Sequence, residues 1–135
     1  MKPKTLAYWT TTVLFCLAMG AGGVFDLTLA PQVIEGLQKL GYPAYLGYIL
    51  GFWKVCGVIV LILPGLPLVK EWAYAGFVFN LTGASASHFF SHDTPDKIAT
   101  PLVILAIGIV SYVTRGGCRS LCGMKCEVPE EPKST

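Results

Sequence analysis

The sequence predicts an all-α protein: a four-helix transmembrane bundle with a short amphipathic interfacial helix between its first and second spans. Two observations predict this fold. Hydrophobic residues make up 53% of the 135 residues and charged residues only 13%, whereas soluble domains carry about 25% charged residues. The charges are also nearly absent from four segments of about the ~20-residue length that crosses a bilayer. A soluble domain would have no solvated surface at this composition.

The first span is predicted over residues 5–25, a charge-free run that ends at Asp26. A cleaved signal peptide would also begin this way, but the run is long for one and lacks a clean cleavage site. Pro31 is well placed as the first residue of a short amphipathic helix, which Gly41 and Pro43 end. We expect this helix, rather than a disordered loop, to lie on the outer membrane surface.

The remaining spans are predicted over residues 45–63, 72–90 and 98–114. The second contains a single charged residue, Lys54, and the prolines at 64 and 67 force a tight turn after it. In the third, only His88 could carry charge, and the fourth begins at Thr100 or Pro101. Residues 1–115 therefore form the membrane domain, and residues 116–135 form a soluble tail.

The distribution of Lys and Arg predicts the orientation of the chain. With four spans, both termini lie on one side of the membrane. That side carries Lys2, Lys4, Lys70, Arg115, Arg119, Lys125 and Lys133, whereas the other carries Lys39 and Lys97. The side that carries the termini has seven Lys and Arg residues against two on the other side, which predicts that both termini lie in the cytoplasm.

Polar residues at mid-depth suggest a cavity inside the bundle. Lys54 and Asn80 lie about midway along their spans, on faces of small residues that favour close helix packing. We expect the two side chains to meet, because a lysine at this depth costs about 2.5–3.5 kcal/mol without a partner. Asp26 and His88 lie near the outer ends of their spans and are placed to pair with each other. A direct Lys54–Asp26 bridge would require a tilted helix.

These residues, with Ser87 on the same face of the third span, are the candidate ligand site. We interpret them as a polar cavity open to the outside, suited to a quinone headgroup, an anionic or carbonyl ligand, or a proton path. The alternative is that Lys54 only fixes the register of the helices through polar contacts.

Two weaker patterns could bind metal. His88 and His92 are four residues apart with Asp93 beside them, a spacing that can present two ligands to one ion. The alternative to a metal site is a helix end whose second histidine is solvated, and a bis-histidine haem is disfavoured because both histidines lie on one face of one helix. Cys118, Cys122 and Cys126 recur every four residues in the tail, which fits a plain tail, a metal or redox-sensing site, or an acylated segment.

The sequence resembles the DoxX-like family of small four-span bacterial membrane proteins. The strings that carry the resemblance are LGYPAYL, VKEWAYAGF and NLTGASASH, together with the lysine of the second span. The resemblance extends from Tyr8 to about Arg115. It implies a multi-pass helical bundle in the bacterial inner membrane, with Lys54, Asn80 and His88 on the family's motif positions.

The resemblance implies little about activity. The family takes its name from a subunit of a thiosulfate:quinone oxidoreductase, and distant relatives act as cargo receptors or assembly chaperones. The first hypothesis is thus a redox-associated accessory subunit whose cavity binds a quinone or another small ligand. The alternatives are a non-enzymatic scaffold or assembly chaperone that binds partner transmembrane helices, and a dimeric small-molecule carrier.

No catalytic constellation decides whether the protein is an enzyme, and no basic patch suggests a nucleic-acid partner. The expected partners are the lipid bilayer and either another membrane protein or a second copy of the chain.

Overall fold

The computed structural model describes residues 3–115, which form five helices and contain no strand. The helices are α1 (Pro3–Leu27), α2 (Pro31–Lys39), α3 (Tyr45–Ile62), α4 (Pro67–Phe90) and α5 (Pro95–Val113). Within this part of the chain, α1, α3 and α5 are long and apolar enough to cross a membrane. Three of the four predicted spans are thereby confirmed as candidates. The 24 residues of α4 are long enough, but Lys70, Glu71, Asn80 and His88 make it more polar.

The predicted interfacial helix is confirmed as a helix: α2 begins at Pro31 and ends at Lys39. The chain turns at Gly41, whose φ of +79° lies in the left-handed region that glycine adopts most readily. The helices α4 and α5 begin before the predicted spans, each at a proline, Pro67 and Pro95, because the first helical turn tolerates the missing N–H group. Pro101 consequently lies inside α5 rather than at its start.

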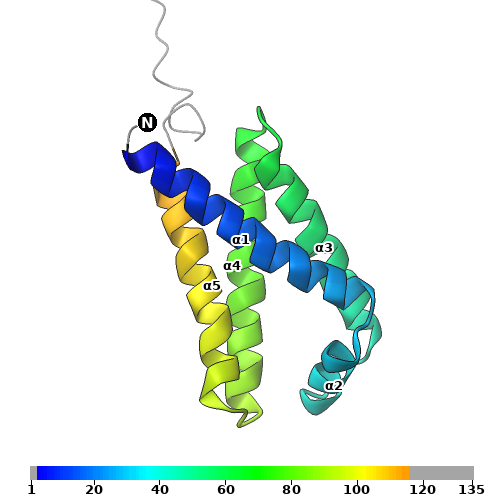
Figure 1. Cartoon of the computed structure of the whole chain (residues 1–135). Coiled ribbons are helices and arrows are strands. Elements are labelled where there is room, and N and C mark those ends of the chain that lie inside the picture. The colour runs from blue at the N-terminus through cyan, green and yellow to red at the C-terminus, as the bar shows by residue number, and fades with distance from the viewer. Residues whose placement is uncertain (1–2, 116–135) are drawn as a thin grey trace, which may run out of the picture.

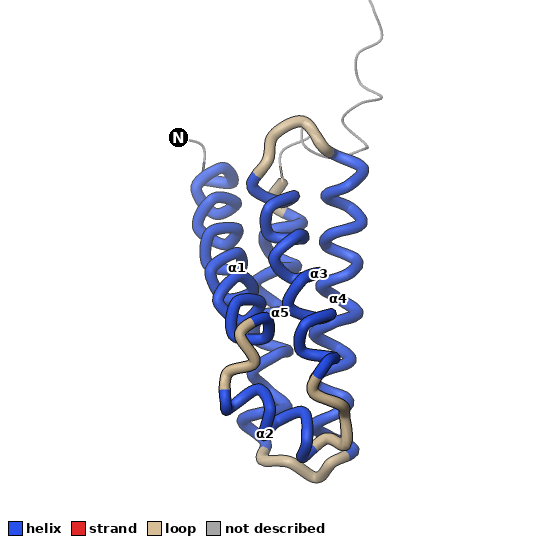
Figure 2. The backbone as a smooth tube through the Cα atoms, turned by 90° about the vertical axis from the view of Figure 1, so that its right-hand side faces the viewer, coloured by secondary structure: helices blue, strands red, loops and turns tan. Residues whose placement is uncertain are grey.

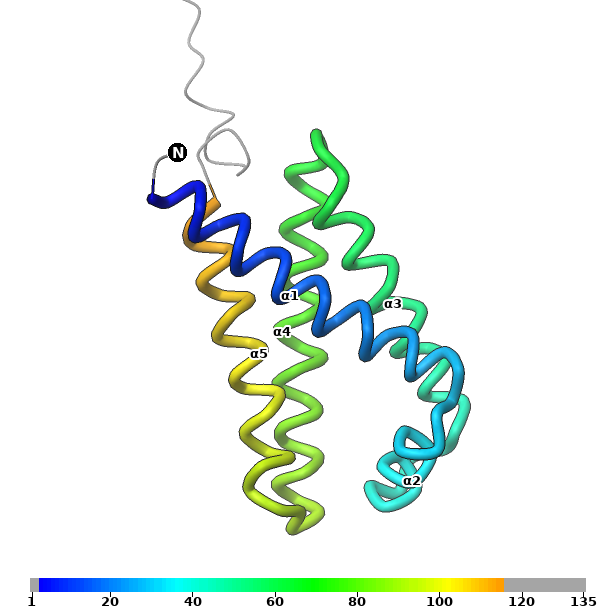
Figure 3. Tube along the Cα trace, in the orientation of Figure 1, coloured from blue at the N-terminus to red at the C-terminus, as the bar shows by residue number. Residues whose placement is uncertain are grey.

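The helix α1 holds the bundle together by crossing the others obliquely (Figure 1). It packs against α3 and α5, while α4 packs against α5 and, less extensively, α3. Figure 2 shows α2 at one end of the bundle. The described chain begins and ends at the opposite end, where the α3–α4 turn also lies (Figure 3). We refer to these as the α2 end and the termini end.

A compact core joins α1, α4 and α5. Phe15 is 1% exposed and packs in edge-to-face geometry on Phe77, with ring centroids 5.2 Å apart. Beside it, the fully buried Ser111 hydroxyl lies 2.6 Å from Thr12 Oγ1 and 2.8 Å from Tyr74 Oη. One hydroxyl therefore links three helices where the surrounding bilayer offers no water to replace it.

Glycines set the distance between α1 and α3. A Cβ added to Gly51 would lie 2.7 Å from the carbonyl oxygen of Gly23, and one added to Gly23 would lie 3.0 Å from Lys54 Cβ. The small-residue faces of the first two spans thus allow backbone contact, as membrane helices require for close packing. This contact brings the end of α1 beside the middle of α3.

The contact between α3 and α4 is restricted to the termini end. A Cβ added to Gly57 would lie 2.5 Å from the Phe77 ring, so this ring fits only against a glycine. Nearer the turn, Lys70 Nζ donates to the carbonyl oxygen of Leu61 at 3.0 Å. Beyond these contacts the two helices diverge toward the α2 end (Figure 1).

Candidate functional site

The charged centre of the site is an ion pair between α1 and α3. Lys54 Nζ donates to Asp26 Oδ2 at 2.6 Å, and the side chains are 19% and 13% exposed. The oblique crossing of α1 and the contact between Gly23 and Gly51 provide the tilt that this bridge requires. Lys54 and Asn80 were expected to meet, and both line the same pockets. Among the described residues no hydrogen bond joins them, because the tilt of α1 brings the Asp26 carboxylate to Lys54 instead.

Asp26 and His88 do not pair with each other, contrary to the sequence-based expectation. His88 Nδ1 instead lies 3.0 Å from Oδ2 of Asp93, in the turn between α4 and α5. Asp26 is occupied by Lys54 on the other side of the bundle. Asp26 on α1 and His88 on α4 lie at similar depth, but the oblique crossing of the two helices holds them apart.

Asp93 is the centre of a second polar cluster, at the α2 end. Its buried carboxylate accepts bonds from Lys39 Nζ at 2.7 Å and from the Thr94 backbone N–H at 3.0 Å. Lys97 Nζ lies 3.6 Å away. The hydrogen bond from Lys39, helped by those from Thr94 and His88, holds the pKa of Asp93 well below its usual range. The cluster ties α2 to the ends of α4 and α5.

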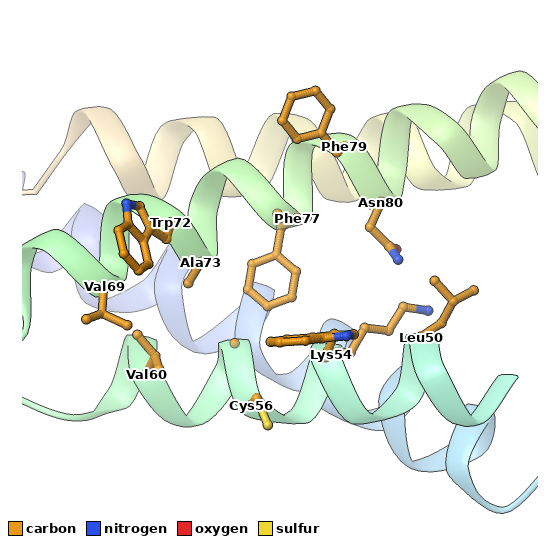
Figure 4. A pocket seen from close by; sticks show the side chains of 13 residues that line it. Leu50, Lys54, Cys56, Val60, Val69, Trp72, Ala73, Phe77, Phe79 and Asn80 are labelled. Carbon is orange, nitrogen blue, oxygen red and sulfur yellow. The ribbon is translucent and has the colours of Figure 1, made fainter. Parts of the chain in front are cut away.

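Asn80 lies opposite the ion pair, on the facing side of the gap between α3 and α4. Figure 4 shows its amide at the same end of the gap as the Lys54 side chain. Within residues 3–115 the Asn80 amide makes no hydrogen bond to the protein, and it is only partly buried. An amide in the apolar interior of a membrane without a partner is unfavourable by several kcal/mol. The amide is thus available to a ligand or to water.

One pocket, here called the outer pocket, has a volume of about 420 Å³ and extends from mid-bundle to the α2 end. All five residues predicted for the ligand site line it: Asp26, Lys54, Asn80, Ser87 and His88. The remaining walls are formed by residues of α2 and the following loop and by further residues of α3 and α4. Tyr42 Oη in that loop lies 3.0 Å from Ser87 Oγ, a contact that holds the loop against α4.

Another pocket, here called the lateral cleft, lies between α3 and α4 and was not predicted. Its volume is about 530 Å³ (Figure 4). Its walls are largely apolar and include Trp53 and Trp72, both about two-thirds exposed on the outside of the bundle. Gly76 also lines it, and a Cβ added there would contact nothing within 4 Å. No pattern in the sequence distinguishes this open face of α4 from one that another helix covers.

The structure does not assemble the weaker metal pattern. His92 is exposed, with a φ of +53°. Of the two histidines, His88 alone contacts Asp93. Lys39 and Lys97 surround that carboxylate and would compete with a cation. Among the described residues no group of three or more His, Cys, Asp or Glu side chains is placed to hold a metal ion. Cys118, Cys122 and Cys126 lie outside these residues.

Comparison with known proteins identifies one relationship. A family model, described as the DoxX-like family, matches residues 10–111 and so covers α1 to α5 almost completely. No curated protein and no solved structure matches the chain.

Proposed function

The chain belongs to the DoxX-like family and is an integral membrane protein, and we propose that it is a redox-associated accessory subunit of the bacterial inner membrane. In this proposal the outer pocket binds the headgroup of a quinone or of a similar carbonyl-bearing molecule. In this proposal the chemistry itself belongs to a partner, and the pocket supplies hydrogen bonds to the headgroup.

The proposal includes four spans with both termini in the cytoplasm. Two facts support α4 as the fourth span: it lies between α3 and α5, and its 24 residues extend about 36 Å. An odd number of spans would separate the two ends of the chain, but both described ends lie at the termini end (Figure 1). The excess of Lys and Arg at that end favours the cytoplasm.

The observation that carries the ligand proposal is that unused hydrogen-bonding groups of Lys54 and Asn80 face each other across the gap between α3 and α4. Asp26 uses one of the three N–H donors of Lys54 and neutralises its charge. The remaining donors of Lys54 and the free amide of Asn80 border the same pocket. A carbonyl placed between them would accept hydrogen bonds from both sides, without bringing a charge into the bilayer.

Native mass spectrometry of the full-length protein from a mild detergent tests this proposal. We expect the wild-type protein to retain a small molecule with the mass of a quinone, or to take up added ubiquinone-1. Lys54→Met and Asn80→Leu should each reduce retention at least ten-fold, while Thr82→Val, a polar-to-apolar change on an exposed face of α4, should not. Equal retention by all four proteins would refute the proposal.

A second function, a scaffold that binds partner transmembrane helices, is favoured by the uncovered glycines of α4. A Cβ added to Gly76 or Gly83 would contact nothing within 4 Å, so this small-residue face has no helix against it within the described residues. Under this alternative, Gly83→Leu would abolish co-purification of a membrane partner while Lys54→Met would leave it unchanged.

A further inference from the structure

Building on the function proposed above, we propose a specific class of ligand: a neutral amphiphile with a single long apolar chain. It enters from the bilayer between α3 and α4. Its chain lies in the lateral cleft, and its head lies beside Lys54 and Asn80 in the outer pocket.

The two pockets lie next to each other. They share four lining residues at mid-bundle, namely Leu50, Lys54, Phe79 and Asn80. Two of these carry the polar groups described above, and the polar groups therefore lie at the junction between an apolar compartment and a more polar one. A molecule that spans the junction must be apolar at one end and capable of hydrogen bonding at the other.

The lateral cleft has the dimensions of a single hydrocarbon chain. From Asn80 at the junction it extends along α4 past Trp72, eight residues away, which corresponds to about 12 Å. Phe77, packed on Gly57, forms its back wall. The volume of about 530 Å³ falls in the range of pockets that enclose small-molecule ligands, about 300–1,000 Å³. The outer pocket, on the α2 side of the junction, is more polar than the lateral cleft. The hydrocarbon chain of the ligand therefore points toward the termini end.

The charges around the junction select a neutral head. Lys54 and Asp26 cancel, and His88 is turned toward Asp93, itself bonded to Lys39. At the junction a carboxylate or phosphate would have to compete with Asp26 for Lys54, since Lys39 and Lys97 lie away from it around Asp93 in the α4–α5 turn. A head with carbonyl or hydroxyl groups would satisfy Asn80 and the spare donors of Lys54 without disturbing the ion pair.

Contacts close both ends of the gap between α3 and α4, so that a ligand can enter only from the side of the bundle. At the termini end, α3 and α4 are joined by their turn and by the bond from Lys70 to Leu61. At the α2 end, the Lys39–Asp93 and Tyr42–Ser87 contacts span the gap. Between these ends the gap is bordered by exposed aromatic side chains, which face the lipid where an amphiphile resides.

Tryptophan fluorescence provides the test, because two of the three tryptophans, Trp53 and Trp72, line the cleft. The Trp9→Phe protein is reconstituted in nanodiscs and titrated with a decyl-substituted benzoquinone. We expect saturable quenching. Gly76→Leu, which fills the cleft, should weaken the apparent affinity at least ten-fold. The matched control Gly22→Leu, where an added Cβ also contacts nothing within 4 Å, should leave it unchanged.

Equal affinity in the Gly76→Leu and Gly22→Leu proteins would overturn the placement of the chain. A second measurement avoids reliance on a folded Gly76→Leu protein. In a protein with Trp72 as the sole tryptophan, bromine at the far end of the decyl chain should increase quenching at least two-fold over the unbrominated probe. No increase would also overturn the placement. If decanoate, added at the same concentration as the quinone, displaces it, then the proposal that the ligand has a neutral head is overturned.

The results separate this inference from the proposed function. If Asn80→Leu abolishes saturable quenching while Gly76→Leu does not, the headgroup site stands and the chain lies elsewhere. If Asn80→Leu and Lys54→Met both leave quenching unchanged, the proposed headgroup site itself is refuted.

Discussion

Replacing Asp26 with Asn would leave the Lys54 ammonium without its carboxylate inside the bilayer. At their separation of 2.6 Å, the two charges attract each other by about 6 kcal/mol at an effective dielectric constant of about 20. Desolvation of both ions offsets much of this attraction, and loss of one partner from a buried pair typically costs about 3–5 kcal/mol. Because 19% and 13% of the two side chains remain exposed, we expect the lower end of that range, about 3 kcal/mol.

The double variant Asp26→Asn/Lys54→Met is the matched control. It removes both charges, so that no ion remains unpaired in the membrane, and we expect its free energy of unfolding to lie within about 1 kcal/mol of wild type.

Unfolding free energies can be measured by titrating detergent-solubilised protein with SDS and following tryptophan fluorescence. The decisive quantity is the coupling between the two substitutions. If Asp26→Asn costs less than about 1 kcal/mol, or if the double variant loses the sum of the two single losses, then the pair does not stabilise the fold and the reasoning from its geometry is wrong.

Three further predictions concern the helix contacts. Ser111→Ala removes the buried hydroxyl that joins α1 to α4 and should lower the free energy of unfolding by about 1–2 kcal/mol, whereas Thr10→Ala, which removes a hydroxyl from an exposed face of α1, should change it little. Gly51→Leu would force α1 and α3 apart and should lower the thermal unfolding temperature far more than Gly22→Leu. Because the pKa of Asp93 is lowered, its carboxylate stabilises the fold above about pH 4 and this contribution is lost as the pH falls further. The unfolding temperature should therefore drop from pH 6 to pH 3, and drop less in Asp93→Asn; equal drops would contradict the role of this cluster.

The sequence was sufficient to predict the helices and five of the residues that line the outer pocket, while their role as a ligand site stays a prediction. Charge-free segments of bilayer length identify the helices, and a lysine on a glycine face is placed toward the interior by its surroundings. It did not predict which polar groups make contact. Contacts such as Lys54 with Asp26 depend on the crossing angle of α1, which follows from backbone contact at Gly51 and appears in no single segment of sequence.

The lateral cleft was unpredictable for a related reason. A face of small residues is the same in sequence whether another helix covers it or it borders an open space. On α3 the face at Gly51 is filled by α1, while on α4 the face at Gly76 is open. The difference arises from the Phe77 ring on Gly57, which joins α3 and α4 near the termini end and leaves them apart beyond it.

The contact of α1 with α3 also bears on how the chain enters the membrane. Asp26 is synthesised before Lys54, and the glycines that bring their helices together lie in the same two segments. When α3 reaches the bilayer, the carboxylate that neutralises its lysine is already present at the end of α1. The two helices can thus enter lipid as a hairpin without net charge from this pair, before α4 and α5 have been translated.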